Sequence, residues 1–168
     1  MIILSATTAE EHSPMRRLPA VTGLDPDLPL LVRTAPGEVP GWDAVSAAFR
    51  EHADPGAHVL DDPVWADATV AEVVAALRAD EERVVVLLAD EVTLRDPSHP
   101  LLAATLVTRE DCEDDEEYAA HVEFGAAFRV TPAAAHDVHA NLVIANLGFE
   151  EFAAWAADAA DGVLRGAP

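Results

Sequence analysis

The sequence predicts a single α/β domain on a mixed sheet of about five to six strands, with three to four helices. Residues 83–90 (RVVVLLAD) contain five consecutive branched aliphatic side chains, which is typical of a central strand buried on both faces. Two strand-and-helix units precede this run, so the first three strands are expected to be parallel. The ten residues 91–100 are too few for a helical crossover, which predicts that the next strand starts an antiparallel meander.

The first half of the chain shows clear element signals. Residues 28–34 form a short apolar run that predicts the first strand. Residues 42–52 place apolar side chains at spacings of three and four, which predicts a helix. Residues 58–62 are expected to form the second strand. The next helix is predicted to begin at Thr69, because Glu72 follows at the spacing of a capping box.

The second half is harder to assign after the central strand. Residues 91–100 contain two turn-forming prolines and are expected to be a loop. Residues 101–107 and 124–131 predict the two remaining strands of the meander, with Phe128 facing the core. The acidic residues between these strands are expected to form a connection.

Three elements are expected at the carboxyl end. Pro132 can begin a short helical turn that runs to residue 139. Residues 142–145 are apolar and could form either a last strand or a continuation of this helix, and periodicity does not separate the two. We favour the strand. Residues 148–159 predict a final helix with one apolar stripe, which ends before Asp161 and Gly162.

The domain organisation is simple. Residues 1–27 contain three prolines and little periodicity, so an irregular arm is expected to precede one domain spanning residues 28–166. Cys112 is the single cysteine, which excludes an internal disulfide. The chain has neither a basic signal-like start nor 18 uninterrupted apolar residues, so a soluble cytoplasmic protein is expected.

Charge is the most unusual feature of the composition. The formal net charge is −21, and every basic residue is an arginine. Direct nucleic-acid binding is not expected, because it depends on cations that neutralise phosphates, and an anionic membrane is disfavoured for the same reason. A basic protein partner is the expected alternative. The charge is also compatible with a role in solubility alone.

Seven acids concentrate this charge in the eight residues 110–117, which we call the acid run. Self-repulsion favours a solvated, mobile loop. The competing interpretation is a partner-binding element. Its residues would be Glu110, Asp111, Glu113, Asp114, Asp115, Glu116 and Glu117.

Two sets of residues could bind a divalent metal. Asp61, Asp62 and Asp90 stand at the ends of predicted parallel strands, at the edge where open α/β sheets commonly bind ligands, and carboxylates suit Mg²⁺. His136 and His139 are three residues apart and could share a helical face that binds zinc. The alternative for the aspartates is turn formation, and the alternative for the histidines is an ordinary surface position.

Motifs of common enzyme classes are missing from the sequence. It contains no GxSxG, GxGxxG, P-loop or CxxC pattern. We therefore predict no catalytic residue and no cofactor, although a site assembled from scattered residues would leave no such pattern.

Several segments resemble one known family. Residues 141–152 (NLVIANLGFEEF) and 161–166 (DGVLRG) are the most specific, and residues 28–34, 59–63, 98–102 and 128–132 match in order. Together they resemble a bacterial domain family of unknown function, numbered 6924, over residues 28–166. The resemblance implies a small α/β domain in a cytoplasmic, actinobacterial setting, and no catalytic residue. Gly148 stands where the family has aspartate.

The family-like terminal segment also contains residues that could form a site. We single out Asn141, Asn146, Phe149, Glu150, Phe152 and Arg165. The alternative is structural, because asparagine suits turns and caps, and arginine is favourable near a helix carboxyl terminus.

Two functional hypotheses follow from the sequence. The leading one is a non-enzymatic protein-binding module for a basic partner, such as an immunity protein or an inhibitor. The alternative is a small enzyme or divalent-metal-binding protein that uses the strand-end carboxylates or the histidines. The oligomeric state is left open.

Overall fold

The computed structural model describes residues 16–80 and 82–168, which form one mixed six-stranded sheet. The strands are β1 (Leu30–Arg33), β2 (His58–Leu60), β3 (Val85–Ala89), β4 (Leu101–Thr105), β5 (Ala127–Val130) and β6 (Val163–Leu164). Their order is β2-β1-β3-β4-β5-β6. β1 is parallel to β2 and β3, whereas β4 is antiparallel to β3 and β5. The predicted α/β class, parallel start and meander are therefore confirmed.

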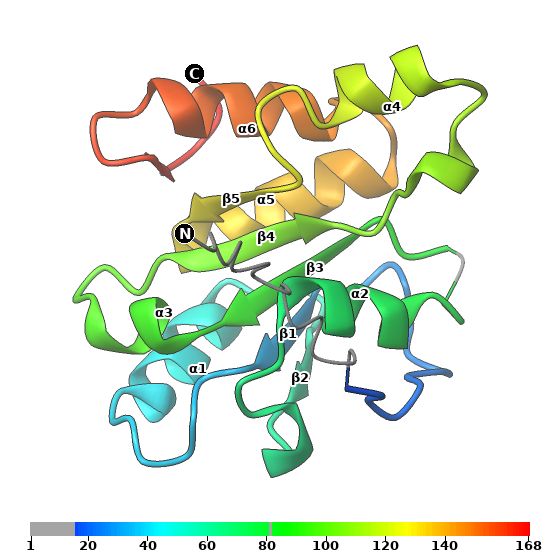
Figure 1. Ribbon diagram of the computed structural model, residues 1–168. Coiled ribbons are helices and arrows are strands. Elements are labelled where there is room, and N and C mark those ends of the chain that lie inside the picture. Colours follow the sequence, from blue (N-terminus) through cyan, green and yellow to red (C-terminus); the bar gives the residue numbers. More distant parts are fainter. Residues whose placement is uncertain (1–15, 81) are drawn as a thin grey trace, which may run out of the picture.

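Six α-helices occur in the described residues, more than the three to four expected. They are α1 (Trp42–Glu51), α2 (Val70–Leu77), α3 (Glu91–Arg95), α4 (Asp115–His121), α5 (Pro132–Val143) and α6 (Phe149–Asp158). Two short 3₁₀ helices, η1 (Pro63–Trp65) and η2 (Arg109–Asp111), follow β2 and β4. Helix α2 covers one face of the sheet, and α1 and α5 cover the other (Figure 1).

Alternation along the strands builds two hydrophobic cores. The first core joins the sheet to α1, α5 and α6 and includes Leu31, Phe49, Leu87, Phe128 and Phe152. The second core joins the sheet to α2 and includes Leu30, Val32, Val73, Leu77 and Leu88. All five residues of β3 are buried, which confirms the central strand. Its apolar run has no polar side, because both faces of β3 are covered.

Three local predictions are wrong, and the first two concern residues 91–100 and 142–145. Residues 91–100 are not entirely a loop, because Asp90 caps α3 by accepting a hydrogen bond from the Thr93 backbone at 3.0 Å. Residues 142–145 are not a strand: they contain the end of α5 and a turn with Ala145 at φ 52°. Helix α5 continues past the histidines to Val143, with Leu142 partly buried against the first core, and periodicity could not separate these alternatives. The sixth strand is β6, which pairs in parallel with β5.

The acid run is not a loop either. It spans η2 and the start of α4, and Asp114 caps α4 by accepting a hydrogen bond from the Glu117 backbone at 2.8 Å. Asp115, Glu116 and Glu117 occupy the first turn of α4, where the helix dipole favours negative charge. Local capping therefore offsets the self-repulsion that predicted a loop.

The arm before the domain packs on α2 over the part that the structure describes. Leu18 is buried in the second core, and the Val21 backbone donates a hydrogen bond to the Ala76 carbonyl at 3.1 Å. The Arg16 backbone donates to Glu72 at 2.8 Å. Residues 1–15 of the predicted arm lie outside the described residues.

None of the helices in residues 16–80 and 82–168 is long and apolar enough to cross a membrane.

The predicted capping box of α2 is present. The Thr69 hydroxyl accepts from the Glu72 backbone at 3.2 Å, and Glu72 accepts from the Thr69 backbone at 2.9 Å. Replacing Thr69 by alanine is expected to lower the free energy of unfolding by about 1 kcal/mol, because an orphan backbone donor of the first turn loses its acceptor. Urea denaturation measures this loss, and Ala71→Ser, at an exposed position outside the cap, is the control. Equal effects of the two substitutions would contradict the role of the cap.

Candidate functional site

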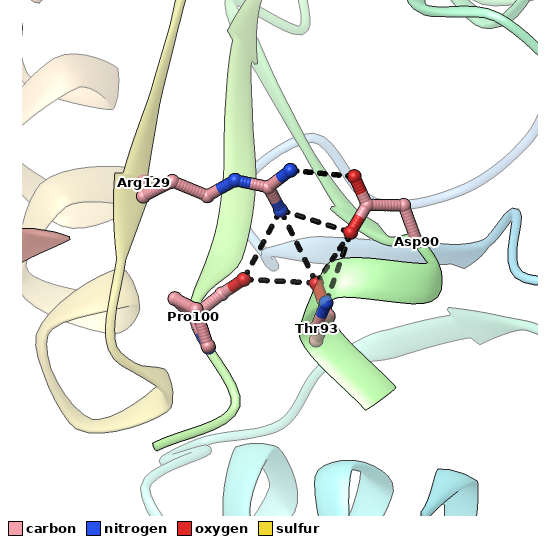
Figure 2. Close-up of polar contacts among 4 residues, drawn as sticks. All are labelled: Asp90, Thr93, Pro100 and Arg129. Carbon is pink, nitrogen blue, oxygen red and sulfur yellow. Dashed lines mark hydrogen bonds and ion pairs between the residues drawn. The ribbon is translucent and has the colours of Figure 1, made fainter. Parts of the chain in front are cut away.

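The strongest polar network lies where β3, α3, β4 and β5 meet (Figure 2). Arg129 of β5 donates to both carboxylate oxygens of Asp90, at 2.9 Å and 2.6 Å. The same guanidinium donates to the Pro100 carbonyl at 3.2 Å. The buried Thr93 hydroxyl donates to the Pro100 carbonyl at 2.8 Å and lies 3.0 Å from Asp90. Asp90 therefore serves at once as helix cap and as partner in a two-point ion pair.

Hydrogen bonds keep the pKa of Asp90 below its ordinary value. Burial by itself would raise its pKa, but the hydrogen bonds from Arg129 and from the Thr93 backbone outweigh burial, and the pKa lies below its ordinary value. Asp90 is thus a carboxylate at neutral pH. An ionised carboxylate already paired with an arginine is poorly suited to accept a proton from a substrate.

A second arginine lies at the end of β1. Arg33 donates to Asp61 at 3.1 Å, and its guanidinium carbon lies 5.3 Å from the centre of the Trp42 ring in α1. Asp62 does not join this pair, because it caps η1 by accepting from the Val64 backbone at 2.9 Å. Asp61 and Asp62 thus perform two separate local tasks.

The two arginine–aspartate pairs lie on opposite faces of the sheet. Arg33 shares the side of Leu31 and α1, because side chains alternate along a strand. Arg129 lies between Phe128 and Val130, which both point into the first core, so it points to the other face. Asp61 and Asp90 therefore do not form a common carboxylate cluster.

The two predicted histidine ligands lie near the amino ends of the parallel strands, opposite the end at which the predicted aspartate ligands lie. His136 and His139 of α5 line a cavity beside residues that precede β1 and β2, whereas Asp61 and Asp90 follow β2 and β3. Among residues 16–80 and 82–168, no group of three or more histidine, cysteine, aspartate or glutamate side chains is arranged to bind a metal. Metal binding by Asp61, Asp62, Asp90, His136 or His139 stays a prediction.

The family-like residues are distributed over several local contacts. Asn146 donates to the Asn141 side chain at 2.8 Å, across the turn after α5. Phe149 and Phe152 are buried in the first core. Arg165 donates to both oxygens of Asp161, at 2.9 Å and 2.7 Å, and this pair lowers the pKa of Asp161 to about 2. These contacts order the end of the chain and do not converge on one cavity.

A third histidine, His121, which precedes the predicted ligands His136 and His139 in the sequence, links the acid run to the family-like segment. His121 at the end of α4 lies 2.8 Å from the Thr105 hydroxyl and 3.7 Å from Glu150. Its ring also lies 5.5 Å from the ring of Phe149. Burial lowers the pKa of His121. The His121 side chain therefore connects α4 to β4 and α6 chiefly as a neutral ring.

One known family matches most of the chain. The model of a family described as a domain of unknown function, DUF6924, matches residues 28–167. The chain belongs to the DUF6924 family. No curated protein matches the chain.

The DUF6924 match extends from just before β1 to the residues after β6. It contains the whole described sheet, both arginine–aspartate pairs and the acid run. The arginines of these pairs were missed by sequence reasoning. Arg129 could have been suspected from its place between two core residues of one strand, but its partner Asp90 lies 39 residues away.

Proposed function

We propose that this DUF6924 domain is a non-enzymatic binding module that docks a basic protein through an acidic face. We define this acidic face as the exposed side chains of Glu110, Glu113, Asp115 and Glu116. The observation that supports it is that η2 and α4 bury none of their own residues and yet form capped helices. Helices that bury none of their residues, but present ordered carboxylates, are suited to meet another surface.

Two of these four carboxylates are left without a compensating cation among the described residues. Arg78 pairs with Glu110 at 3.1 Å, and Arg109 pairs with Asp115. Within the residues that the structure describes, Glu113 and Glu116 have no ion-pair partner. Asp115 is 92% exposed at its side chain, so its pair with Arg109 is open to exchange with an external cation.

An exposed aromatic residue follows the acidic face. Phe124, 47% exposed, comes three residues after α4 ends at His121. Aromatic side chains are enriched in the buried centres of protein interfaces, while charged side chains form their rims. Phe124 could therefore supply an apolar anchor at the far end of α4 from the carboxylates. An immunity protein or inhibitor is the sharpest form of this proposal, because electrostatic steering would give it rapid capture of a basic target.

The test neutralises the acidic face without removing its helix caps. The triple variant Glu113→Gln, Asp115→Asn and Glu116→Gln keeps Asp111 and Asp114, which cap η2 and α4. The matched control neutralises the exposed Glu38, Glu51 and Asp158, which form no side-chain hydrogen bond or ion pair with another described residue. Both variants change the net charge equally.

We expect the native protein to capture a basic protein from lysate at about 0.05 M salt and to release it near 0.5 M. Association of the acidic-face variant with that protein should be about tenfold slower than that of the control variant, while dissociation changes little. Stopped-flow kinetics measure both rates, and hydrogen exchange should show protection of residues 109–124 in the complex. Equal slowing in both variants, or protection elsewhere, would refute the acidic face as the docking site.

A further inference from the structure

A cavity of about 350 Å³ lies at the amino ends of β1 and β2. Its walls come from three segments: residues 27–29 before β1, residues 54–56 before β2, and the second half of α5 with the turn that follows. Small-molecule sites in proteins range from roughly 300 to 1,000 Å³, so this cavity suits a small ligand. It is remote from the acidic face, because α4 and η2 contribute nothing to its lining.

Aliphatic side chains form much of the lining. Leu28, Pro29, Pro55 and Val143 line the cavity, and Ile144 stands at its edge with 72% of its surface exposed. Ile144 is the most exposed of the large apolar side chains in the described part of the chain. A ligand with an apolar body would cover this surface and gain the free energy of burying it.

Two imidazoles add polar groups without adding charge. The ring nitrogen Nε2 of His136 lies 2.8 Å from the Phe49 carbonyl, which fixes that nitrogen as the donor. His139 is only 4% exposed, and its Nε2 has no partner among the described residues. Burial lowers the pKa of both histidines, that of His139 to about 4. At neutral pH neither ring repels a cation.

The rim of the cavity is negative. Asp27 and Asp54 line it from the segments that precede β1 and β2, both are exposed, and neither forms an ion pair with a described cation. Arg83 is the one buried arginine in the described part of the chain, and it donates to the carbonyl of the lining residue Leu28 at 2.9 Å. After burial, Arg83 also helps to lower the pKa of His139, but its charge is paired with Asp80 at 2.9 Å. The uncompensated charge at the opening therefore favours a positively charged ligand.

We propose that this cavity binds a small organic cation, with its apolar body against Leu28, Val143 and Ile144 and its protonated amine at Asp27 and Asp54. The proposal is independent of protein binding through the acidic face. An alcohol of the same shape would keep the apolar contacts but lose the attraction to the carboxylates. A carboxylic acid of the same shape would be repelled by them.

Three probes of similar shape test the charge preference: 2-phenylethylamine, 2-phenylethanol and 3-phenylpropionate. Calorimetric titration of the full chain at pH 7 should show the amine binding about tenfold more tightly than the alcohol, and the acid more weakly than both. The double variant Asp27→Asn, Asp54→Asn should bind amine and alcohol equally. No binding of the amine, equal binding of amine and alcohol to the native protein, or an unchanged preference in the variant would overturn the proposal.

A second pair of variants tests the location. Ala140→Phe places a ring in the cavity lining, whereas Ala133→Phe changes another exposed alanine of α5 that does not line it. Amine affinity should fall at least about tenfold in Ala140→Phe only. Thermal unfolding of both variants verifies that they fold, and amide NMR shifts in residues 136–144 of the native protein locate the probe directly. Shifts confined to other residues would also overturn the proposal.

Discussion

Replacing Arg83 by methionine is expected to lower the free energy of unfolding by about 3–5 kcal/mol. The Arg83 side chain is 1% exposed and donates to the carbonyls of Asp25 and Leu28, both at 2.9 Å. It also pairs with Asp80, whose side chain is 11% exposed. Methionine fills a similar volume but donates no hydrogen bond, so it leaves two carbonyls and a nearly buried carboxylate without their partner.

Equilibrium denaturation in urea measures this loss, and Arg78→Met is the matched control. Arg78 also forms one ion pair, with Glu110, but its side chain is 44% exposed. Its substitution should change stability by no more than about 1 kcal/mol. A similar, small effect at both arginines would mean that Arg83 does not fasten residues 25–28 to the start of β3.

Replacing Asp90 by alanine is expected to cost about 2–4 kcal/mol, because it removes the cap of α3 and the partner of Arg129 together. Asparagine separates the two roles. Asp90→Asn keeps a side-chain oxygen that can cap the helix, so its smaller cost reports the charge alone. Glu91→Gln, which removes only an exposed pair with Arg95, should change stability by less than about 0.5 kcal/mol.

The dependence of stability on pH gives an independent measure of the same pair. The pKa of Asp90 is lowered in the folded protein, so its ionised form contributes stability above the ordinary pKa of aspartate. That contribution is lost as the pH falls through the lowered pKa. Denaturation of the native protein and of Asp90→Asn between pH 7 and about pH 3 should therefore show curves that converge in acid. Parallel curves would contradict an ionised, paired Asp90.

Local sequence signals predicted elements well where a single interpretation was available. The capping box at Thr69 and the apolar run of β3 both appear as expected. The strand prediction for residues 142–145 was wrong because a short apolar run suits a strand and a helix equally. The extension of α5 depends on packing against distant residues. The loop prediction for the acid run was wrong for a different reason. Total charge predicted a loop, whereas the Asp114 cap, the helix dipole and the contacts of His121 order α4.

The sequence by itself determined the α/β class, the parallel start and the meander, because these follow from hydrophobic patterns and link lengths within short segments. It also determined the family, because short stretches of residues resemble that family directly. Only the tertiary structure decided which polar residues meet. It pairs Arg129 with Asp90 and Arg33 with Asp61. It also separates the predicted aspartate and histidine ligands, which lie at opposite ends of the parallel strands. Such contacts join residues tens of positions apart, and their geometry depends on strand order and on the face of the sheet to which each side chain points.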